Sequence, residues 1–279
     1  MGVFEGYMKI LLTAHHADEF RGVELFNWTI AKELSKNHDV YFFSFDLGIM
    51  SKHIKDYATI IKKIDQTQKF DMGIISHNSC YNEVSHLCKD KLFISHGIFS
   101  PLDEIPNDRN CRTYGVSEEV QWKRNTEFII RNPVDTEKYQ PQKDGGGGGI
   151  LYLTNHPNSH TNFVLERMGM PLFHCKGEWK VEEFIYRADL VVTSARGAVE
   201  SMACKKPTFI VSPYGFDGYC GEYWELKKNN FGGRRYKKDL SIESFKYELS
   251  KVKNVLDCYN YVIERHSVDK VVERLFREL

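Results

Sequence analysis

Apolar residues along the chain fall into short continuous runs separated by longer stretches of mixed polarity. The runs that we expect to form strands are residues 8–14, 40–45, 72–76, 92–95, 150–154, 171–175, 190–193 and 208–211. Such runs are typical of parallel strands that are covered on both faces. The intervening segments have room for helices, for example at residues 23–35 and 54–64, where apolar positions recur at helical spacing. The pattern therefore predicts an α/β fold with doubly wound sheets.

Five consecutive glycines at residues 145–149 interrupt this pattern. Because glycine favours neither helix nor strand, we expect a flexible joint at residues 141–149. A run of this kind is also what an engineered replacement for a disordered loop would look like, so we assign it no function. The joint would separate two Rossmann-like domains, residues 1–140 and 150–279, and the second would end in two helices within residues 242–279.

Composition narrows the functional class. The 38 basic and 38 acidic residues cancel, so no global charge draws the protein to nucleic acid or to an anionic membrane. Seven cysteines without paired spacing favour a reducing compartment, and no apolar run approaches the roughly 20 residues of a membrane span. The first residues also lack the features of a signal peptide. We expect a cytoplasmic protein with no membrane span and, in the absence of CxxC or HExxH spacing, no metal site.

The most informative stretch is residues 189–207, DLVVTSARGAVESMACKKP. It predicts a buried strand, a tight turn at Ser194 to Gly197 and a helix with Glu200 in its first turn. Amides at a helix N-terminus and the positive end of its dipole favour a phosphate, and Arg196 adds a forked cation. This stretch is therefore a candidate anion-binding site.

The same stretch resembles the donor-nucleotide motif of retaining glycosyltransferases of the GT-B fold, in the large group-1 superfamily. In that family a Glu followed by an AMACG-like segment binds the ribose of the donor, which implies this role for Glu200. A second Glu usually stands eight residues upstream, where this chain has Val192. The resemblance implies two Rossmann-like domains facing a cleft, the first binding the acceptor and the second the nucleotide-sugar donor, with a final helix that crosses back to the first.

Three further segments follow the order of that family. Arg21, Gly22 and Glu24 resemble its GGAE start, where a Gly lies near the donor diphosphate. His96, at the end of a predicted strand, is similar to the family's His near the donor sugar, and His77 is a lesser candidate for that position. Residues 132–135, NPVD, resemble the segment that precedes the hinge.

Two glycine-rich segments complete the candidate site. Residues 214–218, YGFDG, resemble a GGDG loop that faces the donor, and residues 229–235, NNFGGRR, form a second loop with two arginines. We expect His96 and Glu200 to be catalytic. The residues expected to bind the donor are Gly22, Ser194, Arg196, Gly197, Glu200, Tyr214, Gly215, Phe216, Asp217, Gly218 and Arg234.

The resemblance implies a metal-independent glycosyltransferase that needs no cofactor, uses a nucleoside-diphosphate sugar and retains the anomeric configuration. It usually carries an Arg and a Lys after the first strand of the second domain, whereas residues 154–162 here read TNHPNSHTN. Phosphate binding would then depend on other cations, or activity would be weak or absent. The acceptor is left open between a glycan, a lipid-linked sugar, a small molecule and a modified DNA base, for which Lys52, Lys55, Lys62 and Lys63 offer one basic face. A non-catalytic nucleotide-sugar binding protein and a GT-B-fold nucleotide-sugar epimerase are the alternatives.

Overall fold

The computed structural model describes residues 6–142 and 147–277 of the chain. They divide into two compact units. The first comprises the described residues up to Pro133 together with those from Val268 onward, and the second is Val134–Ser267. The division thus falls at Pro133 and not at residue 140. Within the predicted joint, residues 143–146 lie outside the described residues, and Gly147 to Gly149 belong to the second unit, where the Gly149 amide donates to Asp189 (2.9 Å).

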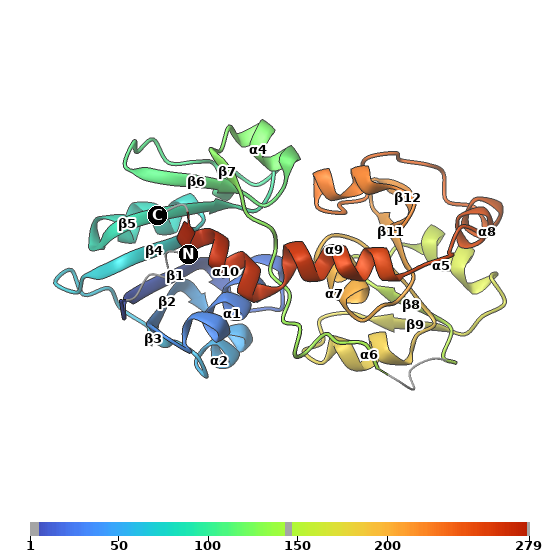
Figure 1. The fold of residues 1–279 in the computed structure, drawn as a ribbon, viewed down its shortest axis with the longest axis horizontal. Helices are drawn as coiled ribbons and strands as arrows, with labels where there is room; N and C mark the ends of the chain where they lie inside the picture. Colours follow the sequence, from blue (N-terminus) through green and yellow to red (C-terminus); the bar gives the residue numbers. More distant parts are fainter. Residues whose placement is uncertain (1–5, 143–146, 278–279) are drawn as a thin grey trace. The chain divides into compact units, whose positions relative to one another are not determined.

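A parallel sheet forms the centre of the first unit. Its strand order is β3-β2-β1-β4-β5-β6-β7, and every pair is parallel (Figure 1). The strands are β1 (Lys9–Ala17), β2 (Asp39–Leu47), β3 (Thr59–Ile61), β4 (Phe70–Ser76), β5 (Cys88–Ser95), β6 (Cys111–Gly115) and β7 (Phe128–Ile129). This is the strand order of a Rossmann fold, in which the chain reverses direction of winding between β1 and β4.

Helices cover both faces of this sheet. They are α1 (Gly22–Leu34), α2 (Ile49–Ile54), α3 (Asn78–Val84), α4 (Glu118–Arg124) and α10 (Val268–Arg277), with 3₁₀ turns η1 (Ser85–Leu87) and η2 (Pro101–Asp103). One core cluster joins Leu11, Phe43 and Phe93 of the sheet to Cys80 and Tyr81 of α3. Helix α10, at the end of the chain, packs against α1 and buries Val271 and Leu275 (Figure 1).

The predicted helix at residues 54–64 is wrong. Helix α2 ends at Ile54, and residues 59–61 form strand β3, which pairs with β2 from Tyr41 to Phe43. The segment Thr59, Ile60 and Ile61 is β-branched throughout, and such side chains favour a strand over a helix. Apolar spacing alone could not separate the two, because two adjacent isoleucines fit either period.

The second unit contains a smaller sheet of order β12-β11-β10-β8-β9, parallel except for the antiparallel pair β11 and β12. Its strands are β8 (Ile150–Leu153), β9 (Leu172–Cys175), β10 (Leu190–Thr193), β11 (Thr208–Ser212) and β12 (Gly215–Tyr219). Its helices are α5 (Ser159–Glu166), α6 (Val181–Arg187), α7 (Arg196–Ala203), α8 (Ile242–Leu249) and α9 (Leu256–His266), and it has one 3₁₀ turn, η3 (Trp224–Asn229), among the described residues. Val191 packs in one core with α7, and Leu190 and Val192 pack in the other with α5 and α8. Both faces are therefore covered, as expected from the apolar run.

Two further predictions of secondary structure need correction. Residues 214–218 were expected to form a loop, but residues 215–219 are the edge strand β12. Residues 242–277 contain three helices, α8, α9 and α10, and not two, because the chain turns at residues 250–255 and again at Ser267. Among the described residues, no helix has the length and apolarity needed to cross a membrane.

Candidate functional site

The second unit has a topological switch point between β8 and β10. These strands are neighbours, yet the helices that follow them, α5 and α7, pack on opposite faces of the sheet. Where neighbouring strands lead to opposite faces, a crevice opens at their carboxyl ends, and this is where open α/β sheets bind ligands. Helix α7 begins at this point.

The turn from β10 into α7 is tight and partly exposed. Ala195 has φ of 52° and ψ of −122°, a conformation that few residues other than glycine adopt. Gly197 lies so close to the sheet that a Cβ would stand 2.3 Å from Thr193 Oγ1 and 3.1 Å from Leu153 Cδ2. Only glycine fits there, and it brings the N-terminal amides of the eight-residue helix α7 to the switch point.

The glycine-rich loop of residues 229–235 docks on this same turn. The Ala195 amide donates to the Phe231 carbonyl (2.8 Å), and the Ser212 hydroxyl at the end of β11 donates to the Gly233 carbonyl (2.8 Å). Gly233 has φ of 68°, and a Cβ there would meet Ser212 Oγ at 2.4 Å. Two segments that the sequence marked separately are thus joined, and they bring partly exposed Arg234 and exposed Arg235 and Lys237 to one edge of the sheet.

Glu200 is not in the first turn of α7, as the sequence predicted, because α7 begins at Arg196 and Glu200 lies in the second turn. Glu200 is 4% exposed, and its carboxylate accepts from Arg196 Nε at 2.8 Å. Tyr139 is also buried here. Burial raises the pKa of its phenol well above the usual range, and the neighbouring Glu200 carboxylate raises it further. Arg196 and Glu200 therefore form a buried ion pair within the helix.

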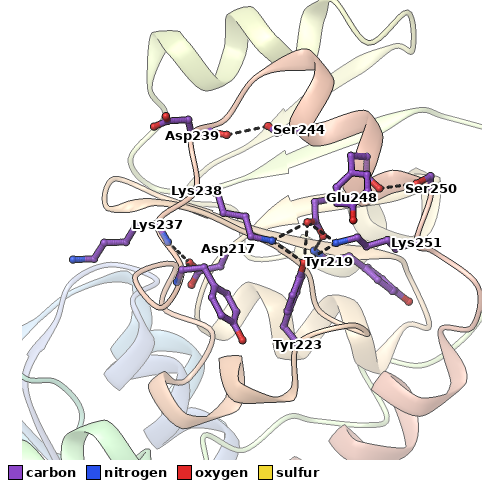
Figure 2. A network of polar contacts seen from close by, with 12 residues as sticks. Asp217, Tyr219, Tyr223, Lys237, Lys238, Asp239, Ser244, Glu248, Ser250 and Lys251 are labelled. Carbon is purple, nitrogen blue, oxygen red and sulfur yellow. Dashed lines mark hydrogen bonds and ion pairs between the residues drawn. The ribbon is translucent and has the colours of Figure 1, made fainter.

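Asp217 holds the basic loop in place. It is fully buried on β12, and its carboxylate accepts from the amides of Arg235 (2.9 Å), Tyr236 (2.7 Å) and Lys237 (3.0 Å). The contact with Lys237 can be followed in Figure 2. The sequence placed Asp217 at the donor, but these contacts give its oxygens to the chain itself. Phe216 is likewise fully buried, against Phe245, while Tyr214 is exposed and Gly215 lies against Lys237.

A second carboxylate, Glu248 of α8, anchors the next stretch of this loop. Lys238, Lys251 and Tyr223 converge on Glu248 (Figure 2). The two lysines donate to Glu248 Oε1 at 2.8 and 2.9 Å, and the Tyr223 hydroxyl donates to the same oxygen at 3.0 Å. Burial raises the pKa of Glu248, but the hydrogen bonds from Lys238, Lys251, the Tyr219 amide and Tyr223 together outweigh it, so the pKa is lowered. Gly218 makes room for this group, since a Cβ there would be 2.6 Å from Glu248 Oε2. Gly218 therefore serves packing at this position.

In the first unit, histidines gather at the carboxyl ends of β1, β4 and β5. His96 Nε2 and the Ser76 hydroxyl are 2.9 Å apart, and the His96 amide donates to buried Asp103 (2.8 Å). Burial and the neighbouring His77 lower the pKa of His96 to about 3, so the imidazole is neutral at pH 7. His96 therefore lies at the strand end where the sequence predicted it.

His77 occupies a strained position beside it. Its φ is 73°, and its Nδ1 accepts from the His15 amide at 2.9 Å. Burial, with smaller contributions from His15 and His16, lowers the pKa of His77 to about 4. With ψ of 129° this conformation lies outside the left-handed helical region and is readily adopted only by glycine, so the surrounding structure must hold the histidine there.

His16 and Asp46 form a pair that the sequence analysis missed. They are register partners on β1 and β2, and His16 Nδ1 lies 2.6 Å from Asp46 Oδ2. Together with His15 they are the one group of possible metal ligands among residues 6–142 and 147–277, with ligand atoms within 4.8 Å of one another. The His15-His16 doublet at the end of an apolar run was the sequence signal that could have revealed it.

Glu24 and Gly22 begin helix α1 at the same edge. Gly22 is exposed, and nothing stands within 4 Å of the place where its Cβ would be, so no close approach requires glycine there. Glu24 is 2% exposed, and burial raises its pKa to about 7, with opposing effects from Arg21 and His16 and a further increase from Asp18.

Comparison with known proteins shows the fold. The sequence matches no family model and no curated protein. Its structure is similar to that of Anabaena HepE in complex with UDP and glucose (TM-score 0.65, 11% identity, 98% of this chain and 99% of that one). It is also similar to a glycosyltransferase from Rickettsia africae (0.62, 12%, 97% of both chains) and to an alpha-glucosyltransferase in complex with UDP and DNA containing an HMU base (0.61, 11%, 98% and 99%). The chain has the GT-B fold.

Proposed function

We propose that this protein is a glycosyltransferase that moves a sugar from a nucleoside-diphosphate sugar to an acceptor hydroxyl. The observation that carries the proposal is the assembly at the switch point of the second unit, where the strained α7 turn and the arginine-containing loop are joined by the bond from Ala195 to Phe231. Two proteins of similar fold, HepE and the alpha-glucosyltransferase, are in complex with UDP in their structures, so a uridine diphosphate sugar is the first donor to test.

The chemistry requires stabilisation of the leaving diphosphate. As the bond to the sugar breaks, negative charge develops on the β-phosphate, and fixed cations and amides lower the energy of that state. We assign this role to Arg234, Arg235 and Lys237 together with the Gly197 amide, and we assign Arg196 to holding Glu200. Neutral His96 would contact the sugar, whose oxocarbenium character a protonated imidazole would oppose.

Retention of anomeric configuration and independence from metals are further parts of this proposal. Retention rests on the motif that includes Glu200, and NMR of the product anomer tests it. Metal independence predicts that transfer continues in EDTA, because cations of the protein take the diphosphate. Loss of transfer in EDTA would instead direct attention to His15, His16 and Asp46.

A non-catalytic nucleotide-sugar binding protein is the second candidate. Val192, where the family motif has its upstream Glu, is fully buried in the core, and Glu200 is paired internally with Arg196. The first removes a carboxylate that would lie near the transferred sugar, and the second engages the carboxylate that would bind the donor ribose. This protein would bind the donor without releasing nucleotide.

The deciding experiment combines a thermal-shift assay with measurement of UDP release from UDP-glucose and related donors. Arg234→Ala is the test variant, and Lys253→Ala, an exposed change on the α8–α9 connection, is the matched control. Stabilisation and slow release that weaken only in Arg234→Ala would support a transferase. Stabilisation without release would support the binding protein, and no response to any donor would refute both.

A further inference from the structure

Two neighbouring histidines at the end of β1 bring their rings together. Successive residues of a strand usually direct their side chains to opposite faces of the sheet, and His15 and His16 are successive residues of β1. Their ring centroids are nevertheless 4.4 Å apart, in an edge-to-face arrangement. Two imidazoles that converge in this way can offer nitrogen atoms to one bound ion.

Asp46 adds a carboxylate to the two rings. It is the register partner of His16 on β2, and its Oδ2 lies 2.6 Å from His16 Nδ1. One ligand atom from each of His15, His16 and Asp46 lies within 4.8 Å of the others. Two ligands of one tetrahedral ion stand about 3.3 Å apart when each is about 2.0–2.1 Å from the metal. Small changes in side-chain torsions would therefore bring all three groups onto one ion.

A serine hydroxyl bonds to the first of these histidines. Ser79 lies on α3, and its Oγ is 2.7 Å from His15 Nδ1. When His15 Nδ1–H donates to this hydroxyl, Nε2 carries the lone pair that a metal ion needs. Histidines that bind a metal almost always bond through their other ring nitrogen in this way, because that bond fixes the tautomer and the orientation of the ring.

Glu24 is an independent indication that a cation binds near these groups. Glu24 is 2% exposed, and its Oε2 has no hydrogen-bond partner among the described residues. The electrostatic influence of His16 on its pKa places Glu24 near His16. A buried carboxylate oxygen without a partner costs free energy, and a positive ion nearby would recover part of it.

The basic residues of this region do not close it to a cation. The charged residues within 15–24 and 44–55 are four acids and three bases, namely Asp18, Glu19, Glu24, Asp46, Arg21, Lys52 and Lys55. Arg21 is engaged with Glu19 at 3.1 Å. Lys52 on α2 and Lys55 at its end are exposed, so water and salt screen the repulsion between their ammonium groups and a bound ion.

The types of ligand indicate the class of ion. Imidazole suits transition metals such as zinc, whereas Mg²⁺ and Ca²⁺ prefer oxygen ligands. We propose that His15, His16 and Asp46 bind a divalent transition-metal ion, with Zn²⁺ the first to test. The ion joins the ends of β1 and β2 and is not assigned to the diphosphate, so this site does not depend on the proposed function. Spacing within one segment could not predict it, because its third ligand comes from another strand.

Calorimetric titration of the full chain with ZnCl₂ at pH 7.5 tests the proposal. We expect one Zn²⁺ per chain. The variants His15→Ala, His16→Ala and Asp46→Asn should each weaken binding by about tenfold or more, because removing even an outer partner of a metal ligand costs about 10–100-fold in affinity. Three variants keep the test decisive if one of them fails to fold.

Two control variants and a second measurement localise the ion. His156→Ala removes an exposed histidine of the second unit and should keep the wild-type affinity. The double variant Lys52→Ala/Lys55→Ala should bind Zn²⁺ at least as tightly, because it removes two repelling charges. Hydrogen exchange of the wild-type chain with and without Zn²⁺ should be slower at residues 13–17 and 44–47 when the ion is bound.

Three results would overturn the metal site. They are no binding of Zn²⁺, binding that His156→Ala weakens as much as His16→Ala does, and slower exchange that falls outside residues 13–17 and 44–47. Binding of UDP by the same preparations in EDTA is measured in parallel. Zn²⁺ binding without any UDP binding would refute the proposed donor chemistry and still support the metal site.

Discussion

At the carboxyl ends of β1 and β2, the polar groups include the carboxyls of Asp18, Glu19, Glu24 and Asp46 and the imidazoles of His15 and His16, and Glu24 Oε2 has no partner among the described residues. At the carboxyl ends of β10 and β11, cations predominate, and the carboxylates beside them are occupied by the chain itself, Glu200 by Arg196 and Asp217 by the amides of residues 235–237. One edge offers acids and histidines to a cation, and the other presents positive charge from a fixed backbone.

The difference shows how one topology serves two ligand chemistries. Both edges lie at the carboxyl ends of parallel strands, where the strand order places a binding crevice. What differs is how each edge treats its acids. Asp217 bonds to backbone amides and fixes a loop, whereas Asp46, Asp18 and Glu19 pair with side chains that are themselves partly exposed.

The largest expected effect is a loss of stability on breaking the ion pair between Arg196 and Glu200 in α7. Glu200→Ala leaves Arg196 buried without its carboxylate, and losing one member of a buried ion pair costs about 3–5 kcal/mol of unfolding free energy. Urea denaturation measures this. Glu183→Ala, which removes an exposed pair with Lys180, is the control and should change stability by about 0.5 kcal/mol or less. Equal effects would show that the α7 pair does not organise its edge.

Lowering the pH should reduce the stability of the first unit through His77, which follows β4. The pKa of His77 is about 4 in the folded protein, below its unfolded value, so its neutral form stabilises the fold above pH 6.5. That stability, about 3 kcal/mol, is lost as the pH falls from 6.5 to 4. His77→Gly removes the imidazole and adopts this backbone conformation (φ 73°, ψ 129°) without strain, so it should flatten the dependence in hydrogen exchange of β1 and β4, whereas exposed His174→Gln should not.

Glu24 should make the unfolding free energy depend on pH in the opposite direction, and Glu24→Gln should remove this dependence. Because the pKa of Glu24 is raised to about 7, its protonated form stabilises the fold below pH 4.5, and this stability is lost as the pH rises through 7. The neutral glutamine should therefore raise the unfolding free energy at pH 8 by about 3 kcal/mol and change little at pH 4.5. Urea denaturation at both pH values, with exposed Glu19→Gln as control, measures the gain. A loss of stability at pH 8 would mean that Glu24 is held in its charged form.

The smallest effect is expected at the cationic loop. Lys237→Ala and Arg235→Ala remove exposed charges, so each should weaken UDP binding by about fivefold, roughly 1 kcal/mol, without changing stability. Calorimetric titration at two salt concentrations checks this, because the difference should shrink as salt rises. Unchanged affinity in both variants would remove the loop from the donor site.

Sequence reasoning was most successful where one segment carries the whole signal. The run from Leu190 to Thr193 is apolar enough to predict a strand buried on both faces without knowledge of the neighbouring strands. Gly197 after it correctly marked the turn. It failed where the answer depends on segments far apart in the chain. Asp217 was expected at the donor because its glycine neighbours suggested a loop, and no local signal indicated that it also bonds to the amides of residues 235–237. The His16 and Asp46 pair exists only because β1 and β2 align in register.

The most direct test of the central claim is hydrogen exchange with mass spectrometry in the presence and absence of UDP. If the carboxyl ends of β10 and β11 bind the diphosphate, UDP should slow hydrogen exchange at residues 194–198 and 229–237 and leave exchange at residues 15–22 unchanged. Protection at residues 15–22 with none at the α7 turn would contradict the account, since it would place an anionic ligand at the acidic edge.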